Sequence, residues 1–434
     1  MKNIAVVGAG IGGLALAYKL RNRCCIDVYE KYSKPGGLAQ CFELEGTSIE
    51  AFFHHFFLSD TELISLINEL NLTDKITYQP TTMGIYYKEG ILPFSNIRDL
   101  LLFKKLSFHS KILFGLHMLY LKKINSWRRL ESLSIRKWME RFYGKEIYEK
   151  IWVPLLHAKF EDHAKDIPMS WLWGRIHPRS VSRRKGKEML GYLKGSLSVL
   201  FDALVKSIGE TNGNVFFNKH IEEINVSDNV VKVRTREDIE EREYDLVVTA
   251  VDTRETLRIV KDIPRENANK LRSIEYYGVI CMVLLLKNPL SNIYWLNNAD
   301  MDMRISGIVE HTNFIKPELY NNKHIAYVFK YLSPEDTLYG NSEDEIYKYF
   351  CKCMKKIYQG FDDSQVITYN FYKTSKATPV YKGAYSRTMP SFEVVPGKIY
   401  MLNTSQIYPE DRNLNNGIKL ANRLVSKLKK AEIL

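Results

Sequence analysis

Cysteines are scarce in this chain, and long apolar runs are absent. Six cysteines in 434 residues do not form the disulfide framework that is typical of small secreted domains. The longest clean apolar run, residues 278–286, is about half as long as a transmembrane helix must be. No internal repeat or low-complexity linker interrupts the sequence. We therefore expect a large globular protein in the reducing cytoplasm.

Metal-binding patterns and a cleavable leader are also missing. No pair of histidines or carboxylates has the spacing of metal ligands, and Cys351 and Cys353 are interpreted as two thiols on one helix. The N-terminus has a lysine and an apolar stretch, as a signal peptide does, but glycines interrupt it from Gly8 onward. Cleavage there would remove the most informative motif of the chain. We predict neither a metal site nor a signal peptide.

That motif occupies the first thirty residues. An apolar run at 3–7 predicts a buried parallel strand. It leads into a glycine-rich turn at 8–13 and then into a predicted helix at 14–20. A second apolar run, 26–29, ends on Glu30. Strand, glycine turn, helix, strand and acid in this order form the fingerprint of a dinucleotide-binding site.

Each residue type in the fingerprint has a physical role. Gly8 permits the tight turn, Gly10 lets the backbone approach a pyrophosphate, and Gly13 lets the helix pack closely on the strand. The unpaired N–H groups at the start of the helix attract the phosphates. Glu30, seventeen residues beyond Gly13, can accept hydrogen bonds from a ribose. The alternative is a glycine-rich turn that binds nothing.

A second glycine pair follows the acid and narrows the choice of dinucleotide. Gly36 and Gly37 precede Leu38 and Ala39, at a position where an ordinary NAD domain needs no such loop. Residues 4–40 as a whole resemble the extended fingerprint of FAD enzymes in the amine oxidase, protoporphyrinogen oxidase and phytoene desaturase superfamily. The resemblance implies that FAD is the cofactor and that this second loop lies along its pyrophosphate and ribityl chain.

Two later segments resemble further FAD contacts of that superfamily. After Gly195-Ser196 and a predicted helix at 197–208, the segment around Ile221 resembles the strand whose backbone contacts the adenine in relatives. Near the C-terminus a predicted strand, a polar loop and a helix at 415–428 resemble the motif whose helix N-terminus faces the flavin. The resemblance therefore adds Ile221 and Asn415 to the candidate cofactor contacts.

These motifs predict an α/β fold with two domains that interleave along the chain. A Rossmann-like FAD-binding domain takes residues 1–70, 191–275 and 390–434 in this prediction. An α+β substrate domain, with an antiparallel sheet and helices, takes residues 71–190 and 276–389.

His55 and Arg412 are the candidate catalytic residues. His55 follows Phe53-His54, where UDP-galactopyranose mutase has a Gly-Pro-His near its flavin. Arg412 precedes a helix start that is similar to one in that enzyme. The resemblance implies that both side chains lie beside the flavin. Each residue also has a plainer interpretation: a core histidine bonded to backbone for His55, and a surface charge or an ion pair with Asp411 for Arg412.

The superfamily resemblance implies an FAD-dependent oxidoreductase. Its flavin would accept a hydride or electrons from a small or amphiphilic organic substrate, or deliver them to a C=C or C=O bond, while the protein supplies orientation and electrostatics. A reduced-flavin sugar mutase similar to UDP-galactopyranose mutase is the first alternative. A lipid carrier of the GDP-dissociation-inhibitor type, without FAD, is the second, and the intact glycines argue against it.

The chain carries a net charge of +12, and one region accounts for all of it. Residues 98–190 contain 21 Lys plus Arg and 9 Asp plus Glu, with apolar residues between the lysines. Such helices suit a membrane surface or an anionic, lipid-linked substrate, so peripheral membrane contact through 98–190 is one hypothesis. The competing interpretation is a core-facing apolar side and a solvated basic side. No nucleic-acid module is recognisable, so nucleic acid is not an expected partner.

Overall fold

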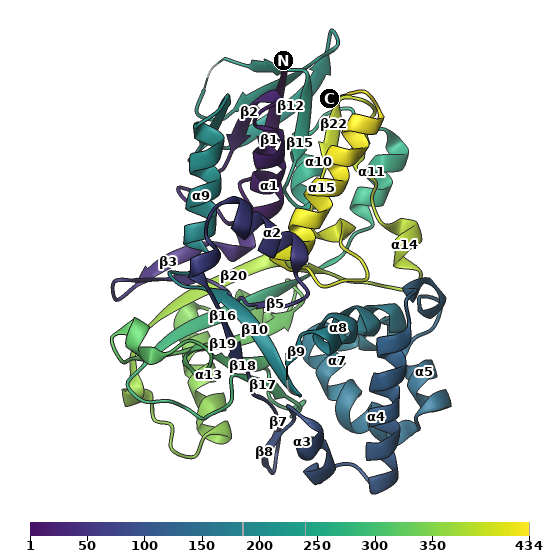
Figure 1. The fold of residues 1–434 in the computed structure, drawn as a ribbon, viewed down its shortest axis with the longest axis vertical. Coiled ribbons are helices and arrows are strands. Elements are labelled where there is room, and N and C mark those ends of the chain that lie inside the picture. The colour runs from purple at the N-terminus through teal and green to yellow at the C-terminus, as the bar shows by residue number, and fades with distance from the viewer. Residues whose placement is uncertain (185, 239, 434) are drawn as a thin grey trace.

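The computed structural model describes residues 1–184, 186–238 and 240–433. Both termini and a six-stranded sheet lie at one end of the molecule, while a seven-stranded sheet and a group of helices lie side by side at the other (Figure 1). This mixed α/β architecture confirms the predicted fold class.

The six-stranded sheet holds the N-terminal fingerprint. Its order is β11-β2-β1-β15-β22-β21, and every neighbouring pair is parallel except β22 and β21. Ile4, Ala5 and Val6 of β1 are fully buried, because both faces of the sheet are covered, as parallel sheets require. The strands are β1 (Lys2–Val7), β2 (Cys24–Tyr29), β11 (Gly213–Phe216), β15 (Leu246–Thr249), β21 (Glu393–Val395) and β22 (Ile399–Met401).

Helices cover one face of this sheet, and a small antiparallel sheet covers the other. The helices pack against Ile4 and Val6, and the small sheet packs against Ala5 and Val7. The covering helices are α1 (Ile11–Leu20), α9 (Ser198–Gly209) and α15 (Leu414–Lys430). The small sheet consists of β12 (Ile221–Ser227), β13 (Val230–Thr235) and β14 (Arg242–Tyr244).

The seven-stranded sheet has the order β20-β16-β19-β18-β17-β7-β8, and only β17 and β7 pair in parallel. Its strands are β7 (Met83–Tyr87), β8 (Gly90–Pro93), β16 (Tyr276–Leu286), β17 (Trp295–Asn298), β18 (Gly307–Glu310), β19 (His324–Leu332) and β20 (Val366–Pro379). Because side chains alternate along a strand, the two faces differ. Val328 and Leu332 pack toward α13 (Glu343–Ile357), whereas Tyr327 and Tyr331 join a cluster that contains Phe53.

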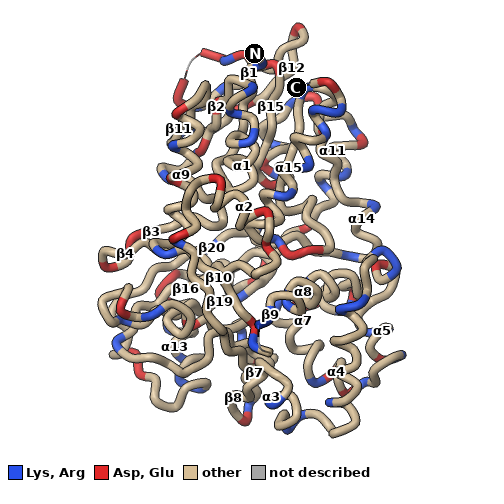
Figure 2. The backbone as a smooth tube through the Cα atoms, in the orientation of Figure 1, with Lys and Arg blue, Asp and Glu red and all other residues tan. Residues whose placement is uncertain are grey.

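Helices of the basic region form a group of their own beside this sheet, and Figure 2 marks their Lys and Arg residues in blue. They are α3 (Ile97–Leu102), α4 (Phe108–Lys123), α5 (Ile135–Phe142), α6 (Lys145–Ile147), α7 (Val153–Phe160) and α8 (Met169–Val181). Within the described ranges, no helix is both long enough and apolar enough to cross a bilayer.

Shorter elements connect the two ends. A hairpin turns at Gly46 between β3 (Cys41–Leu44) and β4 (Thr47–Glu50), and it precedes α2 (Thr61–Glu69). A further sheet joins β5 (Phe56–Phe57), β6 (Ile76–Pro80), β9 (Arg183–Arg184) and β10 (Lys187–Leu193). The remaining helices are α10 (Thr253–Ile259), α11 (Arg265–Arg272), α12 (Thr337–Gly340) and α14 (Tyr385–Thr388).

The predicted elements are present, but their ends differ. The first helix begins at Ile11 rather than at 14, because glycines 12 and 13 take part in it. The helix predicted at 415–428 extends from Leu414 to Lys430. The assignment of segments to two domains stays a prediction.

Gly13 sets how closely α1 lies on β1. A Cβ atom at Gly13 would sit 2.1 Å from the carbonyl oxygen of Gly8. We expect Gly13→Ala to lower the free energy of unfolding by about 1–3 kcal/mol, the usual cost of overpacking, as measured by urea denaturation. Gly115→Ala in α4 is the control, because a Cβ there meets no atom within 4 Å. Equal stability of the two variants would contradict this account.

Candidate functional site

The two glycine-rich loops meet at the start of α1. Gly8 has a φ of +108° and Gly36 a φ of +120°, which are conformations that glycine adopts without strain. The N–H of Gly36 donates to the carbonyl of Ala9 at 2.9 Å. A Cβ on Gly37 would lie 3.4 Å from the Cα of Gly10. The loops therefore form one surface made of backbone.

This surface is open where a pyrophosphate is expected. A Cβ built on Gly10 meets no atom within 4 Å. Gly10 is also the N-cap of α1, no described side chain caps this helix, and its first turn contains no acid. The N–H groups and the dipole of the helix are therefore available to a phosphate. These residues fit the diphosphate of FAD. When FAD is bound, its flavin ring supplies a hydride acceptor.

Glu30 links the first glycine loop to the segment that leads into the second. Its buried carboxylate accepts the N–H of Ala9 at 2.9 Å and the N–H of Tyr32 at 3.0 Å. An ionised carboxylate has about four acceptor positions, so capacity remains for a ribose hydroxyl. Leu38 and Ala39 lie in the short 3-10 helix η1 (Gly37–Ala39) that continues the second loop, with Ala39 buried and Leu38 partly exposed.

Ile221 and Asn415, the other two predicted FAD contacts, already have protein partners. The carbonyl oxygen of Ile221 accepts a hydrogen bond from Nη2 of Arg258 at 3.0 Å. The side-chain oxygen of Asn415 accepts the N–H groups of Glu62 at 2.9 Å and Leu63 at 3.1 Å. Asn415 therefore caps α2 from the start of α15. Contacts of these two residues with FAD stay predictions.

His54 and His55 are partly buried, and neighbouring oxygens hold their rings. Nδ1 of His54 lies 2.6 Å from the carbonyl oxygen of Phe52, and Nδ1 of His55 lies 3.0 Å from the hydroxyl of Tyr294. Burial lowers the pKa of His54 to about 4 and that of His55 to about 3. The charge of Arg412 lowers the pKa of His54 further. At neutral pH both rings are uncharged. His55 can therefore form a hydrogen bond but cannot act as a cationic acid.

Asp411 pairs with Arg175 of α8 rather than with the guanidinium of Arg412. Nη2 of Arg175 lies 2.8 Å from Oδ1 of Asp411. Nη2 of Arg412 donates instead to the hydroxyl of Tyr331 at 2.9 Å. Burial raises the pKa of Asp411, but the charges of Arg175, Lys159 and Arg412 outweigh burial and hold this pKa well below its usual range.

Lys159, near the end of α7, adds a further cation. Its Nζ lies 5.4 Å from the ring centre of Trp171 and 5.5 Å from that of Tyr331. Arg175 lies over the same indole, with Cζ 4.0 Å from its ring centre. Burial lowers the pKa of Lys159 to about 7, and nearby arginines act in the same direction. Cations and aromatic rings thus alternate next to Arg412.

His55 and Arg412, the two candidate catalytic residues, lie near charged side chains that the sequence did not single out. We define the charged cluster as Lys159, Arg175, Arg179, Asp411 and Arg412, whose charges act on one another. The only sequence signal was the basic surplus of 98–190, which contains three of them. Among the described residues no three metal-ligating side chains come together; the absence of a metal stays a prediction.

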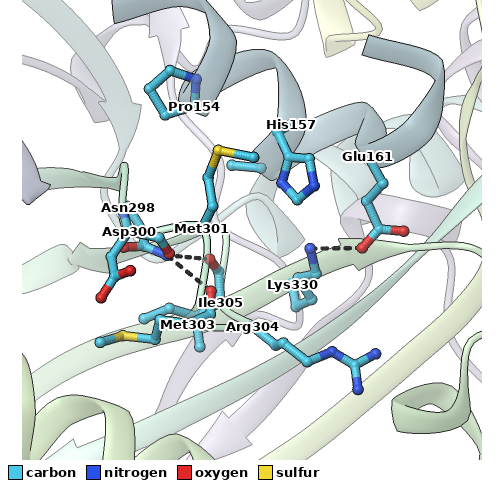
Figure 3. Close-up of a pocket in the computed structure, with 11 residues that line it drawn as sticks. Pro154, His157, Glu161, Asn298, Asp300, Met301, Met303, Arg304, Ile305 and Lys330 are labelled. Carbon is cyan, nitrogen blue, oxygen red and sulfur yellow. Dashed lines mark hydrogen bonds and ion pairs between the residues drawn. The ribbon is translucent and has the colours of Figure 1, made fainter. Parts of the chain in front are cut away.

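A separate cavity lies on the other face of the seven-stranded sheet. It has a volume of about 220 Å³ and is lined by α7, β19 and the segment between β17 and β18. Within it Nζ of Lys330 and Oε1 of Glu161 form an ion pair at 2.7 Å (Figure 3). Lys330 adjoins Tyr331, and adjacent residues of a strand point to opposite faces. The cavity is therefore distinct from the charged cluster.

Comparison with known protein families shows which family the chain belongs to. The sequence model of flavin-containing amine oxidoreductases matches residues 11–393. The chain belongs to this family. Membership confirms the predicted superfamily, the FAD cofactor and the class of FAD-dependent oxidoreductase.

Individual relatives are distant. The mitochondrial protoporphyrinogen oxidase of Nicotiana tabacum is 26% identical over 45% of this chain, and the match spans only 40% of the tobacco protein. Protoporphyrinogen oxidase 2 of Arabidopsis thaliana is 21% identical over 98% of this chain and 94% of its own length. A solved structure of a protein from Exiguobacterium sp. 255-15 has a TM-score of 0.77 at 16% identity, with 99% of each chain covered. The structural likeness shows the fold.

The open position beside Gly10 allows a direct test of FAD binding. We expect Gly10→Val to abolish the flavin absorbance of the purified protein, because a branched side chain occupies the approach of the pyrophosphate. Gly209→Val, at the exposed end of α9 where a Cβ meets no atom within 4 Å, is the control and should retain flavin. A wild-type protein that takes up no FAD would instead favour the carrier alternative.

Asn415→Ala separates capping from cofactor contact. Loss of the cap on α2 should lower the free energy of unfolding by about 1–2 kcal/mol. We expect the FAD dissociation constant to change by less than the roughly tenfold loss that a direct hydrogen bond would cause. Asn422→Ala is the control, because Asn422 also joins α15 to α2, through Glu62. A large loss of FAD affinity with unchanged stability would show that Asn415 contacts the cofactor.

Proposed function

We propose that the protein oxidises an organic substrate that carries an anionic group, and that the charged cluster binds this group beside the flavin. The observation that supports the proposal most directly is the imbalance of charge. Four cations act on the carboxylate of Asp411. Arg179 also has Glu188 at 3.7 Å, which leaves Lys159, Arg175 and Arg412 with Asp411. In addition, the Nε atoms of Arg175 and Arg412 are buried without hydrogen-bond partners in the described part of the chain. Buried, unpaired donors favour an acidic ligand.

The same imbalance disfavours a protonated amine as substrate. A buried charge costs several kcal/mol of desolvation unless it is paired, and Asp411 can pair with only part of the cluster. A cationic substrate would meet like charges, whose repulsion is about 4 kcal/mol at 4 Å in a partly polar environment. A carboxylate or phosphate would offset the excess. The family is named for amine substrates, so an anionic substrate would distinguish the chain within its family.

The remaining residues of the site would orient such a substrate. Arg412 and Arg175 would bind the acidic group, and the rings of Trp171 and Tyr331 would contact its apolar part and exclude water. His55, neutral at physiological pH, would contribute a hydrogen bond. Rigid elements hold these side chains, since Arg175 belongs to α8 and Tyr331 to β19, which favours a fixed approach of the substrate to the flavin.

A reduced-flavin sugar mutase is the second candidate, because a nucleotide sugar is anionic and would also suit the charged cluster. The two functions differ in redox balance. An oxidoreductase substrate bleaches the visible flavin band in the absence of oxygen, whereas a mutase substrate is isomerised only by protein that has been reduced beforehand.

Anaerobic mixing of the FAD-loaded protein with matched pairs of compounds tests the proposal. The two compounds of each pair share the same oxidisable C–H or C–N centre and differ only in a remote group, which is a carboxylate in one compound and an ammonium in the other. We expect the acids to bleach the flavin faster. Bleaching by the amines alone would refute the anionic substrate, and isomerisation of a nucleotide sugar by dithionite-reduced protein would favour the mutase.

The pKa of Lys159 predicts how anion binding varies with pH. Because this pKa is about 7, below the ordinary value of about 10.4, the ammonium loses its charge as pH rises through 7. We expect the affinity for benzoate, followed by the change in the flavin spectrum, to fall about tenfold or more between pH 6 and 9. Lys159→Arg should remove this pH dependence, and Lys159→Met should bind weakly throughout. An unchanged pH profile in both variants would exclude Lys159 from the anion site.

A further inference from the structure

A ridge of large apolar side chains is exposed on α3 and α4. Of the fifteen large hydrophobic residues that are exposed in the described structure, eight lie between residues 97 and 120. Six of these, which we call the apolar ridge, are Ile97, Leu102, Phe108, Ile112, Leu116 and Leu119. Phe108 is 70% exposed and Leu102 is 66% exposed. Large apolar side chains that are exposed together on neighbouring helices are typical of an interaction site.

The ridge is not the core-facing side of these helices. On α4 its members recur at intervals of three or four residues, so they share one stripe of the helix. A different stripe, which includes Phe114 and Leu121, is buried. These two residues pack in separate clusters with other parts of the chain. α4 therefore has apolar residues on two sides, and only one side is packed within the molecule.

Basic residues flank the ridge. Between residues 97 and 123 the chain has six Lys or Arg and a single acid, Asp99. Asp99 is engaged at the start of α3, where its carboxylate accepts the N–H of Ser95 at 2.7 Å. Lys104, Lys122 and Lys123 are exposed. Exposed lysines beside apolar side chains complement a surface that is anionic outside and apolar beneath.

We propose that α3 and α4 dock the protein on the surface of an anionic lipid bilayer. The apolar ridge would enter the interface, and the lysines would reach the headgroups with their long side chains. α3 and α4 lie at the end of the molecule opposite both termini (Figure 1), so a flat bilayer can approach them without meeting the six-stranded sheet. A lipid surface is favoured over an apolar protein face because the basic and apolar residues alternate on the same helices. The inference does not depend on the proposed substrate.

Flotation with vesicles tests this docking. FAD-loaded protein is mixed with vesicles of pure phosphatidylcholine or of phosphatidylcholine and phosphatidylglycerol in equal parts. We expect flotation with the anionic vesicles at low salt, little flotation with the neutral ones, and release at high salt. Failure to float with anionic vesicles at low salt, or equal flotation with both kinds, would overturn the proposal.

Two sets of variants locate the contact. Leu102→Ser/Leu116→Ser/Leu119→Ser removes part of the ridge, and Val181→Ser/Leu319→Ser/Ile367→Ser is its control, because these residues are also exposed but lie elsewhere. Lys104→Gln/Lys122→Gln/Lys123→Gln should lower the partition coefficient by about a hundredfold. Lys316→Gln/Lys429→Gln/Lys430→Gln, at exposed positions away from the ridge, should have a much smaller effect. The flavin spectrum and the unfolding midpoint report whether each variant is folded.

Self-association through the same face is the main competing outcome. Sedimentation velocity without lipid distinguishes it: we expect the wild type and the ridge variant to sediment alike. A dimer that the ridge substitutions abolish, together with equal flotation of the ridge variant and its control, would show that a second copy rather than lipid covers α3 and α4.

Discussion

Helix α1 can lie against strand β1 only because Gly13 has no side chain, and the cofactor surface depends on this close packing. Any larger residue would clash with the carbonyl of Gly8, at 2.1 Å from its Cβ. The other side of α1 is equally tight, since a Cβ on Gly12 would lie 2.5 Å from Leu402 and one on Gly417 would lie 2.9 Å from Ile11. Close approach on both sides fixes the axis of α1 and directs its dipole toward the place of a bound phosphate.

The substrate side of the site depends on charge that is only partly balanced. Asp411 compensates Arg175 directly, and Glu188 lies 3.7 Å from Arg179, whereas Lys159 and Arg412 lie against aromatic rings. Cation–π contacts are worth about 2 kcal/mol when desolvated, so Trp171 and Tyr331 offset part of the cost of burying Lys159. The cluster nevertheless has more positive than negative charge, and the proposed preference for an anionic substrate rests on this excess.

The dinucleotide side could be predicted from the sequence because its determinants are local. Gly8, Gly10, Gly13 and Glu30 lie in one strand–helix–strand unit, whose spacing sets their geometry. The substrate side could not, because its contacts join distant segments: Arg175 and Asp411 are 236 residues apart, and Tyr331 and Arg412 are 81 apart. Lysine and arginine are so frequent in 98–190 that no pattern separates Lys159 and Arg175 from solvated neighbours. Likewise, Asn415 caps α2 across 353 residues, which helix spacing within α15 cannot reveal.

The strand order of the six-stranded sheet has a consequence for how the protein is synthesised. β1 is translated well before β15, with which it pairs, and β15 in turn pairs with β22, which is translated later still. α15, which follows β22, packs in the same cluster as α1. Until residues 399–430 have cleared the exit tunnel, the nascent sheet therefore has an open edge and α1 has an uncovered side. FAD capture must be a late event, and the growing chain has an extended period in which chaperones can bind its apolar strands.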